Sequence, residues 1–263
     1  MSKKVEYRKF TFYDNVLNHQ IRDKRTFETY STSYTKKIKN HDKSIIFNPE
    51  GHGDMNLLAL INKVRRDAKK FINTPDPGFV PQFDLFDIPS ENDTISKIDI
   101  KGAYWEYAKK ANIISKETDE YFITKFSKVA SSHSKMVRLK ALGSLATKKI
   151  VERYIDGQKI EQLTTIQTED TRNLYMSIRH GIDSLIRDIC RANPGVVYYY
   201  VDCLFVRKGI HSKDAIDYLL DSGYKITTED TKVKPILIGN TTYLESISDK
   251  KRYLTRLTNE KIN

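Results

Sequence analysis

The sequence predicts an α+β fold built around a largely antiparallel sheet. Two observations lead to this prediction: helical stretches alternate with short strands, and two of the strand segments each carry an aspartate. The strongest β pattern lies at Val196–Val206, where Val, Tyr and Phe surround Asp202. We expect this segment to form a hairpin that bends near Asp202.

Residues 1–94 form a polar, lysine-rich N-terminal region that we expect to pack on the domain that follows. Within this region, Met55–Phe71 is predicted to be a helix, because its apolar residues recur on one side. An Asn-Thr-Pro-Asp-Pro-Gly turn ends the helix at residues 73–78, and an irregular connector follows.

The second predicted domain covers residues 95–263. It begins with a strand at Ile95–Lys101, and a helix at Ala103–Ile113 follows the intervening glycine. Residues 114–154 are predicted to be a short helical insertion, with helices at about Glu117–Val129 and Ser134–Tyr154.

The remaining elements of this domain also follow from periodicity. Alternation predicts a strand at Lys159–Thr168, and apolar residues at steps of three and four predict a helix at Thr171–Ala192 that lies on the sheet. Beyond the hairpin, we expect a helix at His211–Leu220 and strands at Tyr224–Thr228 and Val233–Ile238.

The chain is basic: 45 Lys and Arg against 34 Asp and Glu give a net charge of +11 and a pI near 9.3. Such a charge favours polyanionic partners, nucleic acid first among them. Basic residues crowd the predicted helices, which indicates either a phosphate-binding surface or a solvated helix face. The crowded residues are Lys109, Lys110, Lys116, Lys125, Lys128, Lys135, Arg138, Lys140, Lys148, Lys149 and Arg153.

Other features of the composition limit the class of protein. No apolar run approaches the roughly 20 residues that a membrane-spanning helix needs, and the N-terminus lacks the apolar segment of a signal peptide. We therefore expect no membrane partner and an intracellular location. Cys190 and Cys203 lack the number and spacing of a disulfide framework or a zinc site, so both are predicted to be reduced, buried thiols.

Asp99, near the end of its strand, and Asp202, in the hairpin, together indicate a metal site. Phosphoryl transfer to a hydroxyl uses two divalent ions about 4 Å apart, held by carboxylates from adjacent strands. A carboxylate among Tyr and Val is costly unless a cation or a donor satisfies it. A single strand-end aspartate is more often a turn or capping residue, so only the pair predicts two Mg²⁺ or Mn²⁺ ions.

Four segments resemble, in chain order, the motifs of family B DNA polymerases. The segment Asp99-Ile-Lys-Gly-Ala-Tyr104 looks like motif A, and Gly143-Ser-Leu-Ala-Thr147 is similar to motif B on the fingers helix. The segment Tyr200-Val-Asp-Cys-Leu-Phe-Val206 resembles motif C. The segment Lys250-Lys-Arg-Tyr253 resembles the Lys-x-Tyr motif that contacts primer phosphates.

The resemblance implies a phage-type polymerase palm with short fingers, which adds deoxynucleoside triphosphates to primer-template DNA during replication, in the cytoplasm of a bacterial host or in a virion. It implies that Asp99 and Asp202 bind the two metal ions and that Tyr104 excludes ribonucleotides. The triphosphate would be held by Arg138, Lys140 and Ser144. The nucleic acid would be contacted by Lys148, Lys149, Lys250, Lys251, Arg252 and Tyr253.

The chain also departs from that pattern. Tyr200 replaces the first aspartate of motif C, and Gly143 and Ala146 replace the Asn and Tyr of motif B. The first 90 residues show no carboxylate motifs of a proofreading exonuclease, and about ten residues after Tyr253 leave no room for a thumb. We therefore expect a partner protein to supply the thumb function.

Two alternatives stay open. One is a catalytically inactive palm that binds nucleic acid or belongs to a virion, which the missing exonuclease and thumb favour. The other is a reverse-transcriptase palm, whose motif A is similar. Its motif C is Tyr-x-Asp-Asp, and Val201-Asp202-Cys203 lacks the second aspartate of that pair.

Overall fold

The computed structural model confirms the α+β class and the predominance of antiparallel strand pairing. The structure describes residues 4–32, 35–48, 55–71, 73–78, 83–87, 89–90, 93–128, 131–166, 169–239, 241–247 and 250–257.

The chain forms two compact units, each made from two separate stretches of sequence. Unit 1 comprises Met1–Asp76 and Ala108–Met176, and unit 2 comprises Pro77–Tyr107 and Ser177–Asn263. The predicted boundary at residue 94 divides the chain by sequence order, whereas these units follow packing.

Unit 1 contains a six-stranded sheet with the order β1-β4-β3-β2-β7-β8. Only the β1–β4 pair is parallel among the described pairings of this sheet. The strands are β1 (Lys4–Lys9), β2 (Phe27–Ser31), β3 (Lys36–Lys39), β4 (Lys43–Asn48), β7 (Lys148–Ile155) and β8 (Gln158–Ile166).

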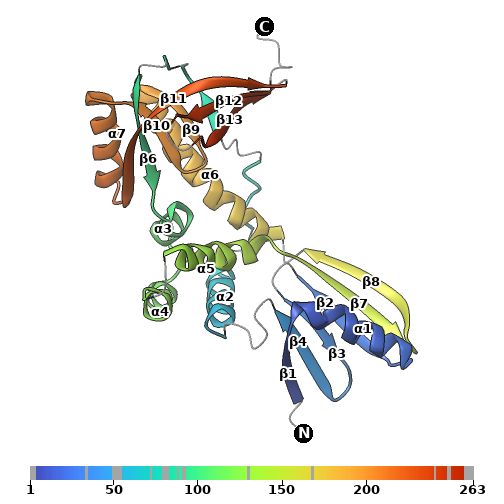
Figure 1. Cartoon of the computed structure of the whole chain (residues 1–263). Coiled ribbons are helices and arrows are strands. Elements are labelled where there is room, and N and C mark those ends of the chain that lie inside the picture. Colours follow the sequence, from blue (N-terminus) through green and yellow to red (C-terminus); the bar gives the residue numbers. More distant parts are fainter. Residues whose placement is uncertain are drawn as a thin grey trace. The chain divides into compact units, whose positions relative to one another are not determined.

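One helix, α1 (Tyr13–Arg22), follows the short 3-10 helix η1 (Phe10–Phe12) and lies along the unit 1 sheet (Figure 1). Its Tyr13 ring contacts Phe47 edge-on at 5.3 Å between ring centres, and Phe27 stacks on Tyr154 at 4.5 Å. These N-terminal strands were not predicted, because they are short and lysine-rich: in β3 only Ile38 is buried.

The helices of unit 1 are α2 (Met55–Ala68), α4 (Lys116–Phe126) and α5 (Ser131–Gly143), with the 3-10 turn η2 (Ser144–Ala146) after α5. Asp67 of α2 is buried and accepts hydrogen bonds from Ser115 N (2.9 Å), Ser115 Oγ (2.7 Å) and Thr118 Oγ1 (2.6 Å). Burial opposes the charge, but the donors from Thr118 and Ser115 hold the pKa of Asp67 below its usual value. This carboxylate therefore joins α2 to the N-terminus of α4.

The predicted helix at 134–154 is wrong beyond Gly143. Residues Lys148–Ile155 form β7, which pairs with β2 and β8. The β-branched Ile150 and Val151 favour a strand once neighbouring strands are available, and this long-range pairing overrides the helical pattern. Lys148, Lys149 and Arg153 therefore lie on a strand.

Unit 2 contains a seven-stranded sheet with the order β13-β12-β11-β6-β10-β9-β5, and its pairings are antiparallel. The strands are β5 (Phe83–Leu85), β6 (Thr94–Ile100), β9 (Val196–Tyr200), β10 (Cys203–Arg207), β11 (Ile226–Ile238), β12 (Thr241–Ser246) and β13 (Arg252–Leu257). The predicted hairpin is confirmed as β9–β10. The two strands expected at 224–228 and 233–238 are one continuous strand, β11.

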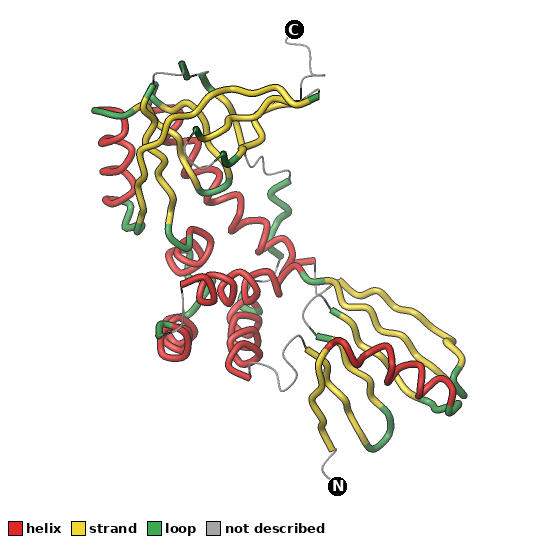
Figure 2. Tube along the Cα trace, viewed as in Figure 1, coloured by secondary structure: helices red, strands yellow, loops and turns green. Residues whose placement is uncertain are grey.

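The helices that accompany this sheet are α3 (Ala103–Lys110), α6 (Glu169–Ala192) and α7 (Ile210–Asp221). With α6 and α7, strands β6, β9, β10 and β11 follow the chain order β-α-β-β-α-β, in which β6 and β10 occupy the two inner positions of the four. Figure 2 shows α6 and α7 as helices beside these strands.

The two faces of the unit 2 sheet carry different clusters. Ile98 and Ile100 of β6 pack with residues of α6 and α7, such as Ile186 and Leu219. On the other face, Ile95 packs with Phe205, Tyr253 and the remaining members of a second cluster. Side chains alternate along a strand, so Lys97 and Asp99 share the face of Ile95.

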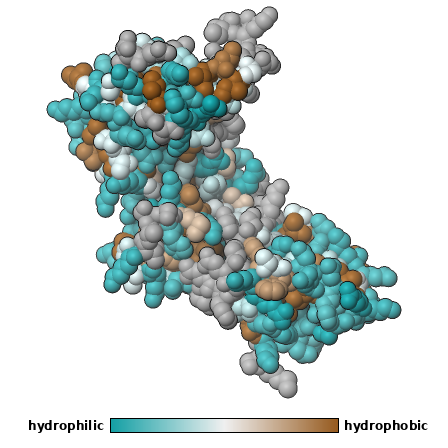
Figure 3. Space-filling model, in the orientation of Figure 1, coloured by the Kyte–Doolittle hydropathy of each residue, from teal (hydrophilic) through white to brown (hydrophobic). Residues whose placement is uncertain are grey.

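Hydrophilic residues cover most of the molecular face seen in Figure 3. Among the described residues, no helix is long and apolar enough to cross a membrane.

Candidate two-aspartate site

Asp99 and Asp202 lie at the same end of the unit 2 sheet. Asp99 is in the central strand β6, where it pairs with Cys203 of β10 on one side and Thr227 of β11 on the other. Asp202 lies in the turn between β9 and β10, and its carbonyl oxygen accepts a hydrogen bond from the Ile100 N–H at 3.1 Å. Sheet register thus brings together two half-buried aspartates that are far apart in the sequence.

The hairpin turn that carries Asp202 has an unusual backbone. Val201 adopts a φ of +60°, in the left-handed region that a β-branched residue rarely occupies. Such a conformation costs about 1–3 kcal/mol and persists only where the surrounding structure holds it. Here the β9–β10 ladder and the β6–β10 ladder hold the turn on both sides.

The thiol of Cys203 lies beside both aspartates. The pKa of Cys203 is raised to about 12, mainly by burial, and the charges of Asp99 and Asp202 act in the same direction. The thiol is therefore protonated at neutral pH and does not serve as a nucleophile. Both cysteines are free, as predicted, with Cys203 buried and Cys190 half-buried.

Two lysines share the surroundings of this thiol, where Lys97 and Lys251 oppose the effect of the aspartates on Cys203. Lys97 is partly buried, and although burial disfavours its charge, Tyr253 together with Cys203 and Glu229 raises the pKa of Lys97. Lys97 was not among the site residues predicted from the sequence. Strand alternation was the signal that could have found it, because Lys97 and Asp99 are two residues apart on β6.

Tyr104, predicted to exclude ribonucleotides, lies in the first turn of α3. It is half-buried and packs against the cluster that contains Ile98 and Ile100. Gly102, with a φ of +64°, makes the turn from β6 into this helix.

The three residues predicted to hold a triphosphate belong to unit 1. Arg138 lies over the Phe122 ring at 5.5 Å, and its Nε is buried without a hydrogen-bond partner among the described residues. Lys140 is half-buried on α5. Ser144 is fully buried, and its hydroxyl donates to the Ala141 carbonyl oxygen at 2.7 Å. The Ser144 hydroxyl therefore stabilises the C-terminal end of α5.

The basic residues predicted to contact nucleic acid are divided between the units. In unit 1, Lys148 and Lys149 lie on β7, and the Lys149 ammonium is 4.8 Å from the centre of the Tyr30 ring. The side chain of Lys148 lies outside the described part of the structure.

In unit 2, Lys250, Lys251 and Arg252 are exposed beside the turn into β13. Arg252 pairs with Glu245 at 2.9 Å, so part of its charge is already compensated. Tyr253 is buried, and its ring meets Phe205 at 4.8 Å between centres. The tyrosine therefore packs in the core, and the Lys251 ammonium lies 5.4 Å from the centre of its ring.

The donor set of this site is small. Among the residues that the structure describes, no group of three or more His, Cys, Asp and Glu side chains could hold a metal ion. Carboxylate oxygens are nevertheless the ligands that Mg²⁺ and Mn²⁺ prefer, and one or two carboxylates suffice when water and substrate phosphates complete the coordination. Asp99 and Asp202 offer carboxylate ligands of this kind.

Comparisons with protein-family models, curated proteins and solved structures found no match to this chain.

Proposed function

We propose that this protein is a template-directed nucleotidyltransferase of the DNA polymerase type, with its active site at Asp99 and Asp202 of unit 2. The position of both aspartates at one end of one sheet carries the proposal, since two-metal phosphoryl transfer needs carboxylates from adjacent strands. The substrates are deoxynucleoside triphosphates and primer-template DNA, and a partner chain supplies any missing thumb function.

The sheet of unit 2 supports a palm. The palm expected from the motif resemblance has one metal-binding aspartate on a strand and the other in a hairpin of the same antiparallel sheet. Asp99 on β6 and Asp202 between β9 and β10 have these positions. The strained backbone at Val201 adds support, because such strain is concentrated at functional sites.

In this function, Asp99 and Asp202 would hold two Mg²⁺ or Mn²⁺ ions. When bound, the ions polarise the phosphate and lower the pKa of the attacking hydroxyl. The exposed Lys250 and Lys251 contribute sequence-independent attraction for phosphates near the site.

One observation favours an inactive palm as a second candidate. Lys97 and Lys251 lie near the same thiol as the aspartates, so lysines already compensate part of the negative charge that a metal would neutralise. A chain of this kind would retain the sheet and bind nucleic acid without chemistry.

Primer extension separates the two candidates. The wild type and the Asp99→Asn and Asp202→Asn variants are supplied with primer-template DNA, deoxynucleotides and Mg²⁺ or Mn²⁺. Loss of either carboxylate should reduce incorporation at least about a hundredfold, because electrostatic stabilisation of a transition state is worth a few kcal/mol. Asp188→Asn, an exposed site on α6 that pairs with Arg191, is the matched control.

DNA binding is measured alongside and should survive in both site variants, since phosphate contacts come from lysines and arginines. A folded wild type that binds DNA yet adds no nucleotide with either metal, even with the host replication proteins present, would leave the inactive palm in place of the enzyme.

A further inference from the structure

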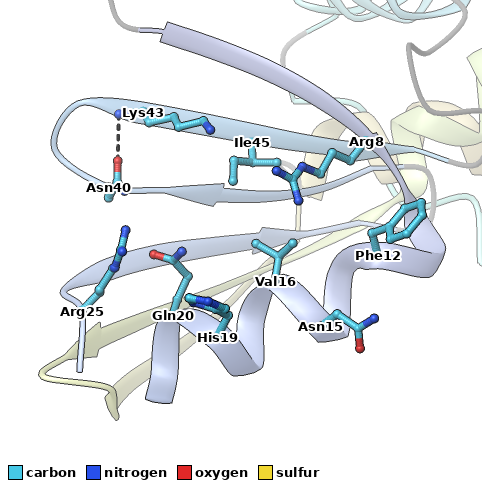
Figure 4. Close-up of a pocket in the computed structure, with 10 residues that line it drawn as sticks. All are labelled: Arg8, Phe12, Asn15, Val16, His19, Gln20, Arg25, Asn40, Lys43 and Ile45. Carbon is cyan, nitrogen blue, oxygen red and sulfur yellow. Dashed lines mark hydrogen bonds between the residues drawn. The ribbon is translucent and has the colours of Figure 1, made fainter. Parts of the chain in front are cut away.

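An open groove lies between α1 and the neighbouring strands, and every residue that lines it belongs to unit 1. Its volume is about 430 Å³, within the usual range of ligand sites. The groove is lined by Arg8, Phe12, Asn15, Val16, His19, Gln20, Arg25, Asn40, Lys43 and Ile45. Figure 4 shows Val16 and Ile45 in its middle, with Gln20, His19 and Arg25 together toward one end and Arg8 and Phe12 toward the other.

Gln20 supplies the feature that points to a ligand. Its side chain is 9% exposed, and its Oε1 is buried without a hydrogen-bond partner among the described residues. A buried polar atom left unsatisfied costs about 1–3 kcal/mol. A ligand that donates an N–H or O–H to this oxygen would recover that free energy.

The charged side chains that line the groove favour an anion. Among the described residues that line it, Arg8, Arg25 and Lys43 are permanent cations, and none is an aspartate or glutamate. Glu6 pairs with Arg8 and Lys43, and Asp23 pairs with Arg25 at 3.1 Å, so two carboxylates outside the lining order the three cations and leave one net positive charge. About half of the Arg25 side chain remains exposed to a ligand.

An aromatic ring completes the site. Phe12 lies at the rim of the groove and is 51% exposed. A ligand that covers its ring would remove this apolar surface from water. Stacking of a nucleic acid base on such a ring is worth about 1–3 kcal/mol and tolerates any base. Phe12 and Gln20 are eight positions apart, which in a helix corresponds to about 12 Å.

We propose that this groove binds single-stranded nucleic acid. One base stacks on Phe12, a second base donates an N–H from its pairing edge to Gln20 Oε1, and the phosphates lie near Arg8, Lys43 and Arg25. The span between Phe12 and Gln20 exceeds one nucleotide, and the contact with Gln20 needs an unpaired base, so a strand fits better than a mononucleotide or a duplex. This site needs neither Asp99 nor Asp202 and extends beyond the proposed chemistry.

The test measures binding of a fluorescent twelve-residue oligothymidylate to the full chain at low salt. The Gln20→Leu variant should lower affinity roughly fivefold, because the base loses its acceptor. The same variant should raise the melting temperature of the free protein, because an unsatisfied buried oxygen is removed. A Gln20→Leu variant that binds the oligonucleotide more weakly but melts at a higher temperature would show that Gln20 Oε1 accepts a hydrogen bond from the ligand.

Arg25→Gln and Arg22→Gln form a matched charge pair. Both residues are exposed, but Arg22 of α1 does not line the groove. Arg25→Gln should weaken oligothymidylate binding at least about threefold more than Arg22→Gln, whereas a diffuse electrostatic contact would make the two variants equal.

Three results would overturn the proposal: equal affinity of the wild type and Gln20→Leu, equal effects of the two arginine variants, or thymidine monophosphate binding as tightly as the oligonucleotide. The primer-extension assay gives an independent result. If extension fails while Gln20-dependent binding persists, the proposed enzyme function is lost and the single-strand site stands.

Discussion

Asp67 in unit 1 and the pair Asp99 and Asp202 in unit 2 are held in different ways. Asp67 accepts three hydrogen bonds from Ser115 and Thr118, which join two helices. Asp99 and Asp202 lie instead beside each other's strands and beside a protonated thiol. The comparison distinguishes a carboxylate whose charge serves folding from a pair that we propose to bind a cation.

The largest expected effect on stability is at Asp67. Replacing Asp67 with Ala removes the acceptor for Ser115 and Thr118 and should lower the free energy of unfolding by about 3 kcal/mol. Urea denaturation measures this change. Glu120→Ala, at an exposed residue of α4 that pairs only loosely with Lys116, should change it by less than about 0.5 kcal/mol.

The same carboxylate predicts a pH dependence. Because the folded-state pKa of Asp67 is lowered, its contribution is complete above the unfolded pKa of about 3.9 and is lost as the pH falls through the lower folded value. The stability difference between the wild type and Asp67→Asn should therefore shrink below about pH 4. A difference that is constant from pH 7 to pH 3 would show that the charge of Asp67 does not matter.

The second largest expected effect is the stabilisation of the folded state by metal at Asp99 and Asp202. Saturating Mg²⁺ or Mn²⁺ at a hundred times its dissociation constant should stabilise the folded state by about 2.7 kcal/mol. Calorimetry of the wild type with and without metal measures this shift, and Asp202→Asn should abolish it. In the absence of metal, Asp202→Asn should not destabilise the fold, in contrast to substitution of Asp67.

If metal stabilises Asp202→Asn as much as the wild type, the cation binds elsewhere. The comparison between the two kinds of carboxylate would then no longer separate a structural site from a metal site.

The smallest expected effect on stability is at Val201, in the turn between β9 and β10. Val201→Gly should stabilise the protein by about 1 kcal/mol or less, because glycine adopts a positive φ without the clash of a β-branched side chain, although its freer unfolded chain offsets part of the gain. The melting temperature measures the gain, and primer extension measures the effect on Asp202. A loss of stability would show that the Val201 side chain contributes more through packing than its backbone costs.

Local pattern was sufficient to predict β6, the long helix α6 and the β9–β10 hairpin. Alternation on β6 and the apolar stripe of α6 reflect the faces that these elements bury, so periodicity indicates them directly. The two aspartates could be singled out in the same way, because a carboxylate within a β-rich segment is unusual.

Tertiary structure alone decided the strand β7, the N-terminal sheet and the groove of unit 1. Lys148–Ile155 became a strand because β2 and β8 offered partners, and the N-terminal strands form a sheet although their own sequence is polar. The groove around Gln20 joins residues from η1, α1, the two strands β1 and β4, and two turns, and no spacing in the sequence relates them. Sequence periodicity records which side of an element is buried, whereas a binding site depends on which distant elements meet, and only long-range pairing determines that.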